Sequence, residues 1–179
     1  MKKIKITNIT LCALFTALSA AFSQIAIPLP PVPINLTHVS IFCAAGLLGT
    51  KSGTLSQIIF VLLGAVGIPV FSGFNGGISH IAGATGGFII GYILCAFLTG
   101  YMIDFFGKNK IYILISAMSA GMILTYICGI TWFMYVTENN FKASLLVFIN
   151  FLPGDAVKII LSSIIVKRLS PVLNKLCHR

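Results

Sequence analysis

Long apolar runs separated by short connections constrain the fold of this chain more than any other feature of its sequence. Such a run buries its side chains either in lipid or in a protein core, and a helix that crosses a bilayer needs roughly 20 apolar residues. Of the 179 residues, 58% are hydrophobic and only 8% are charged. Because a soluble domain typically has about 25% charged residues, we predict an all-α protein embedded in a membrane.

Six apolar runs are candidates for transmembrane helices, and the second and third are shorter than a full span. The predicted helices cover about residues 8–27, 37–48, 53–68, 83–106, 111–136 and 153–169. A shorter amphipathic segment, residues 141–151, precedes the last of them. We interpret residues 1–179 as a single integral membrane domain with structured outer loops.

The first run also resembles a signal peptide, because it has a basic start, an apolar stretch and small residues near its end. Since further apolar spans follow it, we interpret this run as an uncleaved first transmembrane helix.

The basic residues predict the orientation of the six helices. Lys and Arg number 12 against 3 Asp and Glu, which gives a formal net charge of +9. In a six-helix arrangement ten of the basic residues fall on one side, namely Lys2, Lys3, Lys5, Lys51, Lys108, Lys110, Lys167, Arg168, Lys175 and Arg179. The positive-inside rule then places both termini in the cytoplasm. We see no nucleic-acid motif, so the lipid bilayer is the partner that this charge indicates.

Two outer loops have unusual compositions. Residues 27–35 contain four prolines, which make a stiff, extended segment. Residues 67–91 are rich in glycine and have no charged residue, with Phe71, Ser72, Phe74, Asn75 and Ser79 between the glycines. Aromatic faces and uncharged polar groups suit a ligand wall; the alternative is a permissive turn between two membrane helices. Elaborate outer loops and short basic inner loops indicate a site that opens to the outside.

Asp155 and Lys158 are charged residues that topology does not explain. They are three positions apart at the start of the last predicted helix, so they share a face. Ionisable groups at membrane depth are costly and usually functional. One interpretation is a ligand-binding pair, and the other is a mutual ion pair that also caps the helix. Asp104, in contrast, lies near the cytoplasmic end of the fourth helix, where we expect it at the membrane interface.

Rows of small residues mark two of the predicted helices. Ala13, Ala17 and Ala21 recur at four-residue spacing in the first, and Gly83, Gly87 and Gly91 do so in the fourth. Small residues let helices approach closely in lipid. We expect the glycine row to pack inside the protein, whereas the alanine row suits internal packing and a partner surface equally.

No catalytic motif stands out. The segment GLLGTKSG (46–53) lacks the G-x-x-x-x-G-K spacing of a Walker A loop, and neither H-E-x-x-H nor G-x-S-x-G occurs. We interpret His38 and His80 as outer-loop histidines with a capping or solvated role. We therefore predict no metal site, no cofactor and no enzymatic activity.

Several motifs together resemble the BioY family. They are PVPINLTH, LLGTKSG, GIPVFSGFNGG, GATGGFIIG and FLPGDAVK, and they extend over about residues 27–158. The chain departs from the usual family pattern at Ala84 and Phe88, where that pattern has Pro and Tyr. The resemblance implies a high-affinity biotin-binding substrate-binding (S) component of an energy-coupling factor (ECF) transporter. It also implies the partners of such a component, a transmembrane coupling protein and two ATPase subunits.

The resemblance also implies functional residues. Asn75, Asp155 and Lys158 would contact the bicyclic ring of biotin, and the first outer loop would cover the valeryl chain. The full predicted substrate-binding set is Asn75, Asp155, Lys158, Phe74, Asn35 and Phe88. Ala13, Ala17 and Ala21 would form the interface with the coupling protein. Two hypotheses compete with this function: a stand-alone transporter or channel that works without ATPases, and a small intramembrane enzyme that uses Asp155.

Overall fold

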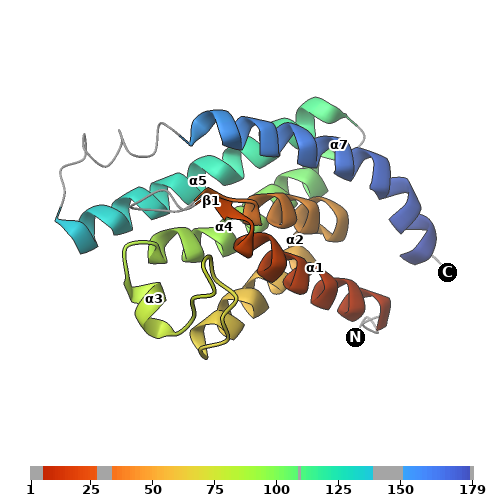
Figure 1. Ribbon diagram of the computed structural model, residues 1–179. Helices are drawn as coiled ribbons and strands as arrows, with labels where there is room; N and C mark the ends of the chain where they lie inside the picture. The colour runs from red at the N-terminus through yellow and green to blue at the C-terminus, as the bar shows by residue number, and fades with distance from the viewer. Residues whose placement is uncertain (1–5, 28–33, 109, 139–150, 178–179) are drawn as a thin grey trace.

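The structure, a computed structural model, describes residues 6–27, 34–108, 110–138 and 151–177. All of its longer elements are helices, with axes that run broadly in one direction (Figure 1). The helices are α1 (Ile6–Gln24), α2 (Thr37–Ala65), α3 (Ile78–Ala82), α4 (Gly86–Phe106), α5 (Ile111–Thr137) and α7 (Leu152–Cys177). Two-residue strands β1 (Ala26–Ile27) and β2 (Ile34–Asn35) pair antiparallel, with Ala26 opposite Asn35.

The described helices confirm that this is a multi-pass membrane protein by length and composition. Four of them, α1, α2 taken over its full length, α4 and α5, are long and apolar enough to cross a bilayer. Two predicted features lie largely outside the described residues. One is the proline-rich first outer loop, in which residues 28–33 are not described, and the other is the amphipathic segment 141–151.

Helix α2 contains both the second and the third predicted helix, folded back on each other at Gly49. The hydroxyl of Ser19 lies 2.9 Å from Ser40 Oγ and 3.2 Å from Gln57 Oε1. A straight helix would separate those two partners by about 25 Å, at 1.5 Å per residue. Gly49 has φ 78° and ψ −179°, a conformation that is essentially limited to glycine. The prediction of an inner loop over residues 49–52 is therefore wrong. Gly49 is the one residue of this segment with a non-helical conformation, and a single glycine is enough to reverse the chain.

Close backbone approach joins the two halves of α2. A Cβ on Gly53 would lie only 2.8 Å from Cα of Ala45, so the glycine is required for this contact. Several other predicted boundaries shift by a few residues. The first helix ends at Gln24 because the chain turns into β1, α4 begins at Gly86 because Gly83 ends α3, and α7 continues to Cys177.

Of the predicted glycine row, Gly87 and Gly91 pack inside the protein as expected, whereas Gly83 precedes α4 and ends α3. Gly87 and Gly91 are buried against α5, where a Cβ on Gly91 would come within 3.1 Å of Cα of Thr125. Gly121 of α5 packs closely against α4 in the same way, since a Cβ added at Gly121 would lie 3.0 Å from Cys95 Sγ. Small residues on both helices thus allow α4 and α5 to pack closely.

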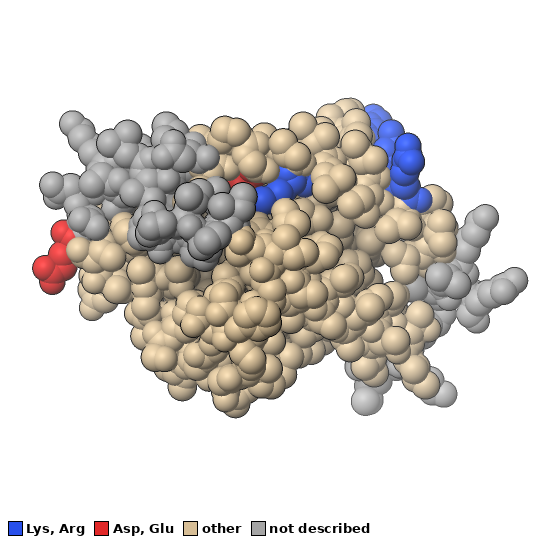
Figure 2. Space-filling view, in the orientation of Figure 1, with Lys and Arg blue, Asp and Glu red and all other residues tan. Residues whose placement is uncertain are grey.

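The bundle has two distinct ends. The start of α1, the end of α7 and the turn between α4 and α5 lie on one side in Figure 1, and α3 lies on the other. In the same view, the Lys and Arg side chains at the edge of the protein gather on the side where α7 ends (Figure 2). This arrangement separates a basic end, which contains the turn at Gly49, from an end where α3 and the outer connections lie.

Candidate functional site

A pocket opens at the end of the bundle opposite the turn at Gly49. The space between its lining residues is about 710 Å³, including the part open to solvent. Every long helix contributes to its wall. The lining residues are Ser23, Asn35, Thr37, His38, Phe60, Phe71, Ser72, His80, Thr85, Phe88, Ile89, Tyr92, Met122, Thr125, Tyr126, Phe151, Asp155 and Lys158.

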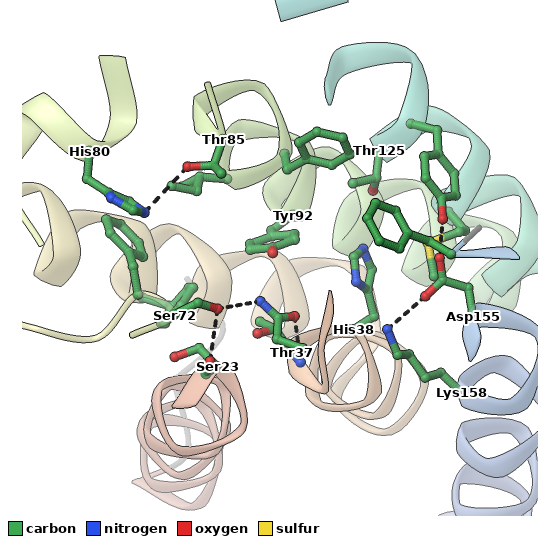
Figure 3. Close-up of a pocket in the computed structure, with 18 residues that line it drawn as sticks. Ser23, Thr37, His38, Ser72, His80, Thr85, Tyr92, Thr125, Asp155 and Lys158 are labelled. Carbon is green, nitrogen blue, oxygen red and sulfur yellow. Dashed lines mark hydrogen bonds and ion pairs between the residues drawn. The ribbon is translucent and has the colours of Figure 1, made fainter. Parts of the chain in front are cut away.

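One end of the pocket has both of its charged residues. Lys158 Nζ lies 2.8 Å from Asp155 Oδ1, and both side chains are about 8% exposed. The other carboxylate oxygen accepts a hydrogen bond from the Tyr126 hydroxyl of α5 (Figure 3). The i, i+3 spacing at the start of α7 places Asp155 and Lys158 on one face. They form the mutual ion pair that one interpretation predicted, and they also face the cavity that the other requires.

The opposite end of the pocket is polar and uncharged. Asn35 Nδ2 donates to Ser72 Oγ at 2.7 Å, and the Ser72 hydroxyl donates to the Ser23 carbonyl at 2.9 Å. Asn35 Oδ1 accepts from the Thr37 backbone N–H at 3.2 Å, which fixes the entry into α2. These bonds join the end of α1, the start of α2 and the glycine-rich loop.

His80 of α3 lies near this uncharged end and contacts two neighbouring side chains. Its ring stacks on Phe71 with centroids 5.5 Å apart, and its Nε2 lies 3.4 Å from Thr85 Oγ1. Partial burial lowers the pKa of His80 below its usual value. The neutral imidazole is therefore favoured at this point of the wall.

Aromatic rings form the middle of the pocket. Phe60 meets Phe71 edge to face at 5.7 Å, and Phe88 meets Tyr126 edge to face at 6.4 Å. Edge-to-face pairs of this kind stabilise buried clusters. The pocket therefore suits a ligand with an apolar middle and polar groups toward its ends.

Four of the six predicted substrate-binding residues lie together on this wall: Asn35, Phe88, Asp155 and Lys158. Asn75 and Phe74 lie outside the lining. Phe74 is 73% exposed, and Asn75 Nδ2 donates to the Ser72 carbonyl at 2.8 Å. Asn75 also pairs with Phe71 through two backbone hydrogen bonds. The two residues thus close the turn that presents Phe71 and Ser72 to the pocket.

Several lining residues were not predicted. The interpretation of His38 as a capping or solvated loop residue is wrong, because it lies in the first turn of α2 and is 8% exposed. Tyr92 follows Phe88 by one helical turn, so the same-face rule could have identified it. Tyr126 interrupts an apolar span with a hydroxyl that needs a partner in lipid. Ser23 offers no comparable signal.

Two further predictions can be placed in the structure. Ala13, Ala17 and Ala21 are all exposed on α1, whereas Cys12, Phe15 and Ser19 of the same helix are buried. The alanine row therefore does not pack inside the described part of the protein. No cluster of three or more His, Cys, Asp or Glu suited to a metal ion occurs among the residues that the structure describes.

Comparisons with known proteins agree with one another. The model of the BioY family matches residues 1–175. The probable biotin transporter BioY of Pyrococcus horikoshii is 39% identical over 93% of this chain and 98% of its own length. The biotin transporter BioY of Thermotoga maritima is 36% identical over 87% of this chain and 91% of its own.

A solved structure has the same fold. The crystal structure of the S-component for biotin from an ECF-type ABC transporter superposes with a TM-score of 0.87 at 33% identity, and the match covers 94% of this chain and 93% of that one. Sequence and structure lead to the same conclusion: the chain belongs to the BioY family.

Proposed function

We propose that this protein is the biotin-binding S component of an ECF transporter. It captures biotin at the extracellular face and delivers it with a coupling module driven by ATPase subunits. The observation that carries the proposal is the pocket, in which a buried Asp155–Lys158 pair and an uncharged polar end flank an aromatic middle. Membership in a family whose curated relatives are biotin transporters supports it.

The bonding capacity of the charged end suits the ureido ring of biotin. That ring offers two N–H donors and one carbonyl acceptor. After its bonds to Lys158 and Tyr126, the Asp155 carboxylate still has lone pairs that can accept an N–H. Lys158 has further N–H donors for the carbonyl. A site that pairs such groups rejects ligands that lack them.

The other predicted ligand contacts follow from their positions. Asn35 and Phe88 contact the ligand from the wall that they already line. We retain Asn75 and Phe74 as proposed contacts, and these require the glycine-rich loop to move toward the pocket on binding.

Orientation and partners complete the proposal. Counting the halves of α2 separately, the chain crosses the cell membrane six times with both termini in the cytoplasm, as the positive-inside rule indicates. The partners are a transmembrane coupling protein and two ATPase subunits. The exposed row of Ala13, Ala17 and Ala21 is the docking surface for the coupling protein, because small residues allow close helix approach in lipid.

Equilibrium binding to the purified protein in detergent tests the ligand directly. We expect titration calorimetry to give nanomolar biotin binding and no heat from riboflavin or thiamine. Both control vitamins are water-soluble and lack the bicyclic ring system of biotin. If the correctly folded protein does not bind biotin, or binds a control vitamin equally well, the proposed ligand is wrong even though the fold assignment stands.

A further inference from the structure

His38 is a buried polar residue whose outer nitrogen has no hydrogen-bond partner. It is the second residue of α2, its exposed fraction is 8%, and its Nε2 makes no hydrogen bond to any residue that the structure describes. Buried polar atoms almost always have partners, because an unpaired one is destabilising. An exception of this kind inside a binding protein therefore requires an explanation.

Aromatic packing explains where the His38 ring lies. The ring meets Tyr92 edge to face with centroids 5.2 Å apart, and it is tilted against Phe42 at 5.9 Å. These contacts hold the ring by its apolar surface and leave Nε2 unsatisfied. A Phe at this position would make the same kinds of contact, so packing alone does not account for an imidazole.

The surroundings of the ring indicate what completes its bonding. His38 lines the same pocket as Asp155 and Lys158, and Figure 3 shows its ring between Tyr92 and that ion pair. Asp155 and Lys158 already bond each other, and Asp155 also bonds Tyr126. Among these polar groups of the charged end, His38 is the one with a buried nitrogen that has no described hydrogen-bond partner.

We propose that His38 contacts the bound ligand directly and helps to determine its specificity. Nε2 hydrogen-bonds the polar edge of a ring held between it and the Asp155–Lys158 pair. A neutral imidazole can donate or accept at this nitrogen, so it can pair with either an N–H or the carbonyl of a cyclic urea. This assignment rests on the proposed function, under which that polar edge is the ureido group of biotin.

Replacing His38 with Phe tests the contact because it keeps an aromatic ring and removes both ring nitrogens, including Nε2. We expect His38→Phe to lower biotin affinity about tenfold, the loss expected when one well-placed polar contact is removed. The melting temperature of the ligand-free variant should stay the same or rise, since an unsatisfied buried nitrogen has been removed. A purely structural role for His38 would instead lower the melting temperature and the affinity together.

Two further variants make the result specific. Thr54→Val also removes a buried side-chain oxygen without a described partner, but Thr54 lies outside the pocket lining, and it should leave biotin affinity within about twofold. His38→Gln restores a hydrogen-bonding group and should recover most of the affinity that His38→Phe loses. Desthiobiotin, which keeps the ureido ring and lacks the sulfur, should show the same loss as biotin in His38→Phe.

The outcomes separate this inference from the proposed function. Wild-type protein that fails to bind biotin overturns both. Wild-type binding with unchanged affinity in His38→Phe overturns the His38 contact alone. A loss that affects biotin but not desthiobiotin would move the contact from the ureido group to the sulfur side of the ring and would also contradict the assignment.

Discussion

Asp155 and Asp104 are carboxylates near opposite ends of the same helix bundle, and they use their bonding capacity differently. Asp155 is 6% exposed, pairs with Lys158 and Tyr126, and faces a cavity. Asp104 is exposed at the end of α4, where Oδ2 accepts from the Thr50 backbone N–H at 2.8 Å and from the Thr50 hydroxyl at 2.6 Å.

The difference shows that position, rather than residue type, decides what each carboxylate does. Asp104 caps the second half of α2 immediately after the reversal at Gly49, so its bonds stabilise the hairpin of α2. Asp155 keeps spare lone pairs beside a cavity, so its bonds can be completed by a ligand. We therefore expect changes at the pocket end to affect binding and changes at the turn end to affect stability.

Neutralising the two carboxylates in turn is the strongest test of this comparison. We expect Asp155→Asn to lower biotin affinity by more than tenfold, because the amide presents a donor where the carboxylate accepts a ureido N–H. The matched variant Asp104→Asn should leave affinity within about twofold. Titration calorimetry on both purified variants measures the effect, and unchanged affinity in Asp155→Asn would contradict the role of Asp155.

A double variant separates ligand binding at the pocket end from ion pairing. Removing one partner of a buried pair commonly costs about 3–5 kcal/mol, whereas replacing both with apolar residues is often neutral. Asp155→Leu with Lys158→Met also takes the carboxylate from the Tyr126 hydroxyl, so it should melt somewhat below the wild-type protein but above Asp155→Leu alone, and yet fail to bind biotin. If the folded double variant still binds biotin, Asp155 and Lys158 have only a structural role, and Asp155 then does not differ from Asp104 in function.

Gly49→Ala tests the turn end and has the next largest expected effect. A side chain at φ 78° is strained by about 1–3 kcal/mol, and its Cβ would lie 3.0 Å from Asp104 Oδ1. We expect the melting temperature to fall by several degrees while biotin affinity stays within about twofold.

Gly107→Ala is the control for this variant, because Gly107 also has a positive φ but its Cβ would have no neighbour within 4 Å. It should therefore lower the melting temperature less than Gly49→Ala. Equal losses would show that crowding of Asp104 is unimportant, and a large loss of biotin affinity in Gly49→Ala would break the separation of the two ends.

Ala17→Leu touches neither end and should have the smallest effect on the isolated protein. Ala17 is exposed in the middle of the alanine row, so the added side chain should change neither melting temperature nor biotin affinity. It should, however, reduce co-purification with the coupling protein, since a larger residue keeps the helices apart.

The matched control is Ala156→Leu, at an alanine of α7 that is also exposed, and it should leave assembly unchanged. If Ala17→Leu still co-purifies fully with the coupling protein, the alanine row is not the docking surface. Biotin uptake that continues without any ATPase subunit would favour a stand-alone transporter.

The sequence by itself determined the long apolar helices of this protein and the contacts between neighbours on one helix. Apolar runs of sufficient length must form helices in lipid, because every backbone polar group there needs an internal partner. Asp155 and Lys158 meet because residues three apart on a helix are neighbours. The burial of Gly87 and Gly91 likewise follows from a row of small residues that lets a neighbouring helix approach.

Only the tertiary structure decided which distant residues meet. Tyr126 reaches Asp155 from another helix, and Ser72 of the glycine-rich loop bonds the end of α1. His38 at the start of α2 packs against Tyr92 of α4, whereas Asn75 and Phe74 lie outside the pocket lining. Spacing along the chain specifies neighbours within one helix, but the pocket forms where several helices end, and its lining depends on how those helices pack.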